Sequence, residues 1–174
     1  LEGDQKSWDE LVNKHYQPAN RSIPECISNA ESALTNYHKV QGLQTNWGGN
    51  KAFYMPSSDE ITMPKREQFN NSEGLYATWA HECVHSTGHA KRLNRNLTGS
   101  FGSKNYSLEE LVAELGAYII CRRLNISSKI EGHASYIGAW IQSLQSDPTI
   151  LVKQLTKANR AANLILGPEV GEGV

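Results

Sequence analysis

The sequence predicts a single-domain α+β fold that is mostly helical, with a small antiparallel or mixed sheet. Three observations lead to this prediction. The chain has 174 residues, enough for one domain with its own core. Several segments carry apolar residues at helical spacing, and one short stretch alternates as strands do on either side of a turn. Hydrophobic residues make up 39% and charged residues 20%, which excludes a disordered or fibrous class.

The first helix is expected after Ser22, in "IPECISNAESALTNYH". A serine is a typical helix cap, and the residues after it recur at helical spacing. These apolar residues are Ile23, Cys26, Ile27, Ala30 and Leu34. A break follows near Gly42. The segment "KAFYMPSSDEITMP" is then expected to form two short strands, joined by the turn residues Pro56, Ser57, Ser58 and Asp59.

The remaining elements are expected to be helices. Ser72 can cap a helix that runs to Gly88, and "SLEELVAELGAYIICRRL" (107–124) follows a polar loop. Two more helices are expected after it. The last has clear end signals, with Asp147 as cap, Pro148 in the first turn, and Gly167 and Pro168 at its end. These limits predict an extension at 1–21, a domain at 22–167 and a disordered tail at 168–174.

The motif His81-Glu82-Cys83-Val84-His85 carries the clearest chemistry. On a helix, residues four apart differ by about 40° in direction and about 6 Å in height, so both histidines can bind one metal ion. Glu82 lies about 100° round from His81, within reach of a water on that ion without being a ligand. Because this short pattern also arises by chance on solvated helices, the third ligand decides how the motif is interpreted.

His89 is one candidate for the third ligand, but Gly88 and the polar run after it indicate that the helix is ending. Glu110 is the better candidate. It lies on an almost wholly apolar helix, where a carboxylate is costly unless it is paired or bound to a metal. Glu114, one turn further along, is expected to accept a hydrogen bond from a ligand histidine.

An alternative for Glu110 stays open. Ser107-Leu-Glu-Glu110 matches the capping box, in which the glutamate only satisfies a backbone N–H group. In that case Glu114 becomes the ligand. Glu109 is expected to point away into solvent. Cys83 faces away from His81 and is expected to be a buried core residue.

Three segments together resemble a known family: "AFYMPSSDEITMP", "LYATWAHECVHSTGHAKRLNR" and "YSLEELVAELGAYI". The Glu-x-x-Ala-Glu that follows His-Glu-x-x-His resembles the glutamate zincins. The whole set, over roughly residues 22–166, is similar to the metallopeptidase domain of ArdC-type antirestriction proteins of conjugative plasmids and of phage polyvalent proteins. The resemblance implies a zincin-like fold, Zn²⁺ as cofactor and protection of incoming DNA from restriction. In that family a single-stranded-DNA-binding domain usually precedes this one.

If the site is catalytic, His81, His85 and Glu110 hold zinc and leave one position for water, whose pKa falls to about 7. Glu82 is then the general base, and the reaction is hydrolysis of a peptide bond in an unknown protein or peptide. Candidate donors to the oxyanion are Tyr106, His133, Arg92 and Arg95, and the sequence does not choose among them. The strand near Ala52 to Met55 is expected to pair with an extended substrate.

A catalytically silent scaffold that protects DNA or binds a protein is the alternative function. Basic residues gather in one loop and on the last helix: Lys91, Arg92, Arg95 and Lys104, then Lys153, Lys157 and Arg160. With a net charge of −1, solvated charges are favoured over a phosphate-binding surface. No apolar run reaches the roughly 18 residues that cross a membrane. The odd count of three cysteines favours a reducing, cytoplasmic location.

Overall fold

The computed structural model describes residues 24–99, 103–127, 140–142 and 144–168. The order of elements is α2 (Ser28–Gln41), β1 (Gln44–Trp47), β2 (Phe53–Met55), β3 (Glu60–Met63), the short 3-10 helix η1 (Arg66–Gln68), α3 (Ser72–Thr87), α4 (Lys104–Arg123) and α6 (Thr149–Leu166). The fold is α+β and mostly helical with a small mixed sheet, as the sequence predicts.

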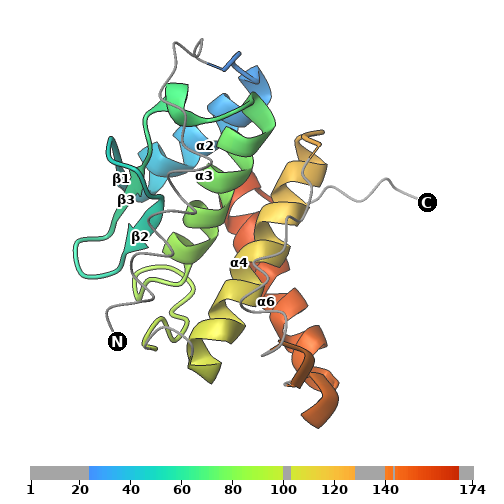
Figure 1. Cartoon of the computed structure of the whole chain (residues 1–174). Coiled ribbons are helices and arrows are strands. Elements are labelled where there is room, and N and C mark those ends of the chain that lie inside the picture. Colours follow the sequence, from blue (N-terminus) through green and yellow to red (C-terminus); the bar gives the residue numbers. More distant parts are fainter. Residues whose placement is uncertain (1–23, 100–102, 128–139, 143, 169–174) are drawn as a thin grey trace, which may run out of the picture.

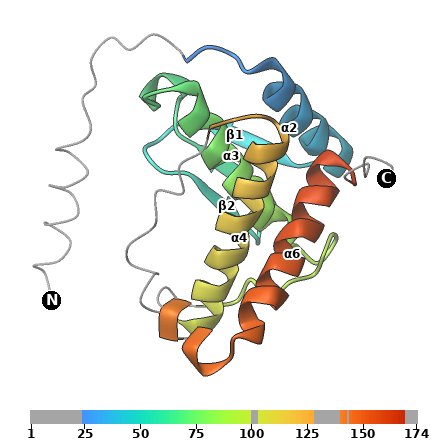
Figure 2. The same cartoon turned by 90° about the vertical axis from the view of Figure 1, so that its right-hand side faces the viewer.

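Helix α3 lies in the middle of the molecule, between the sheet on one side and α4 and α6 on the other (Figure 1). Seen from the side, α4 and α6 run next to each other, and α2 packs beside α3 (Figure 2). The core gathers around the apolar face of α3, where Leu75, Tyr76, Trp79 and Val84 are at most 4% exposed. Burying the central helix on several sides fixes the direction in which its remaining face, with the motif, is presented.

The sheet has the strand order β1-β3-β2. The predicted pair, β2 and β3, is antiparallel with Tyr54 opposite Ile61, and the expected turn joins the two strands. Strand β1 pairs in parallel with β3, with Thr45 opposite Ile61, and was not predicted. Its sequence, Gln-Thr-Asn-Trp, is only four residues long and mostly polar, so it carries little strand signal. Among the described strands, β2 lies at the edge nearest the motif.

The starts of the helices differ from the predicted ones. Helix α2 begins at Ser28, not directly after Ser22, and Ser22 lies outside the described residues. Asn71 caps α3 by accepting the Gly74 backbone N–H at 2.8 Å, so Ser72 is the first helical residue. The last helix starts one residue later than predicted, because Pro148 and not Asp147 is the cap residue and Thr149 is the first helical residue. The Asp147 carboxylate accepts the Thr149 backbone N–H at 2.9 Å, and Gly167 follows the final turn as predicted.

The start of α4 excludes the capping box that the sequence left open as an alternative for Glu110, and it lies earlier than the predicted start at Ser107. The helix begins at Lys104, and Ser103 caps it by accepting the backbone N–H of Tyr106 at 3.2 Å. Ser107 lies inside the helix, and its hydroxyl donates to the Ser103 carbonyl. Glu110 is therefore in the second turn and does not cap the helix. Serines at both positions have cap chemistry, and the sequence alone did not distinguish them.

Candidate metal centre

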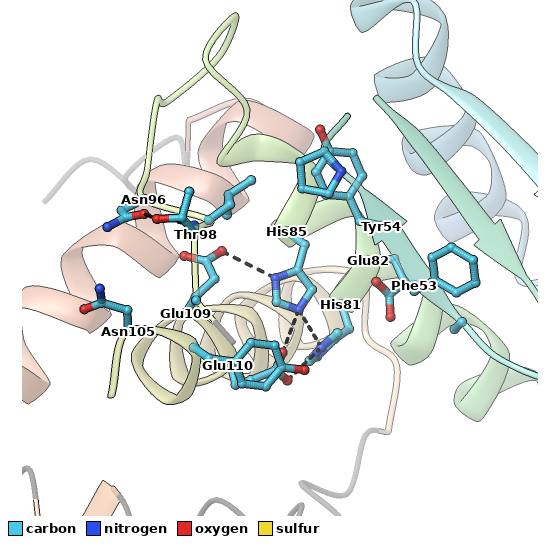
Figure 3. A pocket seen from close by; sticks show the side chains of 15 residues that line it. Phe53, Tyr54, His81, Glu82, His85, Asn96, Thr98, Asn105, Glu109 and Glu110 are labelled. Atoms are coloured by element: carbon cyan, nitrogen blue, oxygen red, sulfur yellow. Dashed lines mark hydrogen bonds and ion pairs between the residues drawn. The ribbon is translucent and has the colours of Figure 1, made fainter. Parts of the chain in front are cut away.

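The two motif histidines lie one turn apart on α3 and point to the same place. Their Nε2 atoms are 3.1 Å apart, and their ring centroids are 4.8 Å apart (Figure 3). At this distance one ring can donate an Nε2–H to the other, and the same two nitrogens can instead both direct their lone pairs at one cation. Both side chains are about 15% exposed, so the site is open to small solutes.

Glu110 reaches the histidines from α4. Its Oε1 lies 3.4 Å from His85 Nε2, and its Oε2 lies 3.7 Å from His81 Nε2. Four tetrahedral ligands at about 2.0–2.1 Å from a zinc ion are roughly 3.3 Å from one another. The 3.4 and 3.7 Å distances belong to the two different oxygens of Glu110, and one donor atom from each of the three residues lies within 4.8 Å of the others. The donor set of two imidazoles and one carboxylate is therefore clustered closely enough for one ion and fits a divalent ion in chemistry.

A close approach of the two helices brings Glu110 to this position. Gly116 of α4 faces Val84 of α3 so tightly that a Cβ atom at Gly116 would lie 2.8 Å from Val84 Cγ2. Real Cβ atoms do not come that near to a neighbour, so only glycine permits this contact. The helix that carries Glu110 is thereby held against the helix that carries His81 and His85.

Each histidine has a carboxylate behind its other ring nitrogen. Glu114 Oε1 lies 3.6 Å from His81 Nδ1, on the predicted side of the ring but beyond the length of the predicted hydrogen bond. Glu109 Oε1 lies 3.4 Å from His85 Nδ1, and Arg95 donates to both oxygens of Glu109 at 2.6 and 3.0 Å. The expectation that Glu109 points into solvent is wrong. The loop after α3 folds back over that face of α4, a long-range contact without a local sequence signal.

The charges of the site favour a cation. Burial lowers the pKa of His85, but hydrogen bonds with Glu109 and Glu110 outweigh this effect and raise it to about 10. Burial raises the pKa of Glu110, yet the hydrogen bond with His85 brings it below the usual value. The carboxylates are thus ionised at neutral pH, and the site attracts positive charge between the two imidazoles. At neutral pH a proton on His85 provides this charge, and a divalent ion would take the place of that proton on binding.

Glu82 lies where two cavities meet. It is 6% exposed and lines a cavity of about 390 Å³ that runs along β2 and the start of α4. It also lines a second cavity, of about 830 Å³, between the start of α3 and the middle of α4. Ala52 and His81 border both. An extended molecule lying through the two cavities therefore passes directly over Glu82 and the candidate metal ligands.

The other candidate residues are placed as follows. His89 does not belong to the cluster, and its Nδ1 accepts the Lys91 backbone N–H at 3.2 Å. Arg92 and Arg95 have side chains only 2% and 7% exposed, and both are held in ion pairs. Tyr106 lines the first cavity and hydrogen-bonds to Glu110. His133 lies outside the described residues.

The three cysteines are free thiols, and the expectation for Cys83 is confirmed. Cys83 is fully buried beneath the motif, with Sγ 3.3 Å from the Nε2 atom of His38. Cys121 is also buried, and Cys26 is exposed. In the part of the chain that the structure describes, none of them joins the cluster of metal-ligand type.

The geometry agrees with the comparisons with known proteins. The sequence profile described as zincin-like metallopeptidase matches residues 32–157. The chain belongs to this family. Among solved structures, this zincin-like domain is similar to the antirestriction protein ArdC of plasmid R388. The TM-score with its Mn(II)-bound form is 0.71 at 29% identity, over 88% of this chain and 57% of that one. Its metal-free form gives a TM-score of 0.70 at 31% identity.

Curated relatives extend the comparison. The domain is 39% identical over 154 residues to a protein named DNA primase TraC of Escherichia coli, and it spans 10% of that protein. It is 38% identical over 123 residues to the uncharacterized protein y4eC of Sinorhizobium fredii, of which it spans 40%. The chain thus covers about a tenth to somewhat over half of the relatives that it matches. No helix among the described residues is long and apolar enough to cross a membrane.

Proposed function

We propose that this domain is a zinc-dependent peptidase that cleaves extended peptide segments, within a longer antirestriction protein of a mobile genetic element. The observation that carries the proposal is the position of Glu82. This buried carboxylate adjoins the three candidate metal ligands at the meeting point of two cavities. A scaffold that only binds has no use for an acid–base group at that place.

The metal in this proposal is Zn²⁺, held by His81, His85 and Glu110. Two imidazoles and one carboxylate are a common catalytic zinc set, and zinc binds nitrogen and oxygen donors more tightly than manganese does. When bound, the ion acts as a Lewis acid on the scissile carbonyl and makes water nucleophilic near neutral pH. Glu109 and Glu114 keep the two imidazoles oriented, with the lone pairs directed at the ion.

The residues of this chain perform the proton transfers and the binding. Glu82 accepts the proton of the attacking water and returns it to the leaving amine. Of the four candidates for stabilising the oxyanion, Arg92 and Arg95 are committed to buried ion pairs. Among the described candidates, Tyr106 is the one that borders the cavity beside Glu110, and we assign it this role. The edge strand β2 pairs with the peptide backbone.

A DNA-binding role for these surfaces has less support. In the described part of the chain, no lysine or arginine lines either cavity. Of the loop residues suggested for phosphate contact, Arg92 and Arg95 have buried side chains that are held in ion pairs, whereas Lys91 and Lys104 are exposed. The antirestriction role in this proposal is supported by the similarity to ArdC. Binding of single-stranded DNA is assigned to other parts of the longer protein. The free thiols favour a cytoplasmic location.

The test is a peptidase assay on a broad peptide library with zinc-loaded protein and its Glu82→Gln variant. The two proteins differ only in the carboxylate of residue 82, which becomes an amide, and they have the same metal ligands. We expect the parent to cleave a subset of peptides and the variant to lose at least about a hundredfold in rate. If equal metal loading is confirmed and the two proteins cleave alike, Glu82 is not the base and the proposal is wrong.

A further inference from the structure

The turn between β2 and β3 carries a carboxylate that is bound from two directions. The Tyr54 hydroxyl of β2 donates to Asp59 Oδ1 at 2.8 Å. Arg92 donates to the same carboxylate through Nη1, at 3.3 Å from Oδ2, and through Nη2 at Oδ1. Asp59 also adopts a left-handed backbone conformation, with φ of 56°. The carboxylate thus joins the turn to the strand on one side and to a cation on the other.

Arg92 continues this connection to the helix that carries the motif. Its Nε donates at 2.7 Å to the carbonyl of Ser86, the residue directly after His85. Its side chain is 2% exposed, so water does not substitute for these partners. One buried guanidinium therefore links the turn of the β2–β3 hairpin to the last turn of α3, next to a candidate metal ligand.

We propose that Asp59 and Arg92 are positioning residues for the substrate. They hold the edge strand β2 in a fixed position relative to the His81–His85 motif. A peptide that pairs with β2 then has its scissile bond next to Glu82. The inference rests on the proposed function, because it specifies how that function places an extended peptide. Strand β2 borders the first cavity through Phe53 and Tyr54, which puts its outer edge along the path of the peptide.

Strand pairing and metal binding depend on different parts of the molecule. Backbone pairing requires donor–acceptor distances near 2.9 Å on several successive residues, so a small displacement of β2 weakens all of them together. The three candidate ligands lie on α3 and α4, and the contact of Gly116 with Val84 holds those helices together. Loss of the link between Asp59 and Arg92 is therefore expected to weaken binding of long peptides while metal affinity stays unchanged.

The experiment uses zinc-loaded protein with Glu82→Gln, which binds without cleaving. Random peptide pools of two lengths, about twelve and about four residues, are equilibrated with the protein, and retained peptides are quantified by mass spectrometry. Asp59→Asn keeps the size of the side chain and removes its charge. Lys91→Met is the matched control, because Lys91 Nζ lies 3.7 Å from the same carboxylate but is 74% exposed. Tyr54→Phe removes the hydroxyl that donates to Asp59 and accepts from Arg92, and it leaves the ion pair of Asp59 with Arg92 in place.

We expect Asp59→Asn to reduce retention of the long pool about tenfold, the size of effect that follows from losing a few backbone hydrogen bonds. The short pool and zinc affinity should change less than about twofold. Lys91→Met should retain the long pool as well as the parent, which here is the Glu82→Gln protein. Retention by Tyr54→Phe should lie between that of the parent and that of Asp59→Asn. Hydrogen exchange over residues 51–58 should be faster in Asp59→Asn.

Two results overturn the inference: equal retention of the long pool by Asp59→Asn and the parent, or no retention of the long pool by the parent itself. Failure of the proposed function is distinct from both. It shows as a lack of cleavage by protein with intact Glu82, even when long peptides are retained and depend on Asp59.

Discussion

At the scale of single residues, the site depends on carboxylates that are not themselves ligands. His85 contacts Glu109 through Nδ1, and Arg95 keeps Glu109 in place with two hydrogen bonds. His81 has Glu114 in the corresponding position. A carboxylate next to the Nδ1–H group of an imidazole fixes the tautomer of the ring. It also makes the other ring nitrogen a stronger ligand for a metal ion. Glu109 and Glu114 thus orient the two histidines so that their free ring nitrogens can bind an ion.

We therefore predict that Glu109→Gln and Glu114→Gln each weaken zinc binding by about 10–100-fold. Glu109→Gln should also lower the free energy of unfolding by about 3 kcal/mol, because Arg95 loses a buried counter-ion. Competition titrations with a chelating dye and urea unfolding measure the two effects. Glu73→Gln, on α3 but outside the cluster, controls for the loss of one charge. Unchanged zinc affinity in both variants would contradict the assigned roles.

A second residue-scale feature is the buried histidine under the motif helix. Trp79 Nε1 donates to His38 Nε2 at 3.0 Å, so the proton of the neutral ring is on Nδ1, which faces the Leu43 carbonyl at 3.2 Å. Burial lowers the pKa of His38, whereas the hydrogen bond with Leu43 opposes this effect. Protonation of Nε2 requires Trp79 to lose its acceptor.

Because the pKa of His38 is lower in the folded protein, the unfolded chain binds the proton first. The contribution of neutral His38 to the free energy of unfolding is therefore complete above about pH 6.5, and it is lost as the pH falls below that value. We predict that the stability difference between the parent and His38→Gln shrinks by up to about 1.4 kcal/mol per pH unit in that range. Urea unfolding at several pH values measures it. A difference that is constant with pH would refute the neutral, buried state.

At the scale of elements, the contact between α3 and α4 sets the distance from the histidines to Glu110. Gly116→Ala should push α4 away from Val84, weaken zinc binding by about tenfold and cost about 1–3 kcal/mol of stability. Adding Val84→Ala removes the two methyl groups that the new Cβ meets. The double variant should recover most of the metal affinity although it stays less stable. Tight zinc binding by Gly116→Ala alone would show that the approach of the helices is not what positions Glu110.

The elements also show which features the sequence could predict. Spacing of four residues was enough to pair His81 with His85, and Glu110 with Glu114, because helix geometry is local. Strand β1 was missed because four mostly polar residues have no pattern of their own until β3 lies beside them. The ion pairs of Glu109 and Asp59 could not be predicted from the sequence for a related reason. Their partners, Arg95 and Arg92, come from a loop whose path over α4 and the hairpin is set by tertiary packing.

At the scale of the whole molecule, a metal ion at this site connects two helices that are separated by a long loop. His81 and His85 belong to α3, and Glu110 belongs to α4. An ion that binds only the folded arrangement stabilises it in proportion to the logarithm of its free concentration. A metal ion held there would therefore strengthen the packing of the central helix as well as provide the proposed catalytic group. The assignment of these three ligands is the central claim.

Metal content after chelation and reloading with Zn²⁺, measured by elemental analysis, tests this claim most directly. The account predicts about one zinc per chain in the parent and in His89→Ala, and little or none in Glu110→Ala after dialysis. Thermal unfolding shows whether each variant is folded. An absence of zinc in the folded parent would contradict the account, and so would full loading of Glu110→Ala. Loss of zinc from Glu114→Ala alone would move the third ligand one turn along α4.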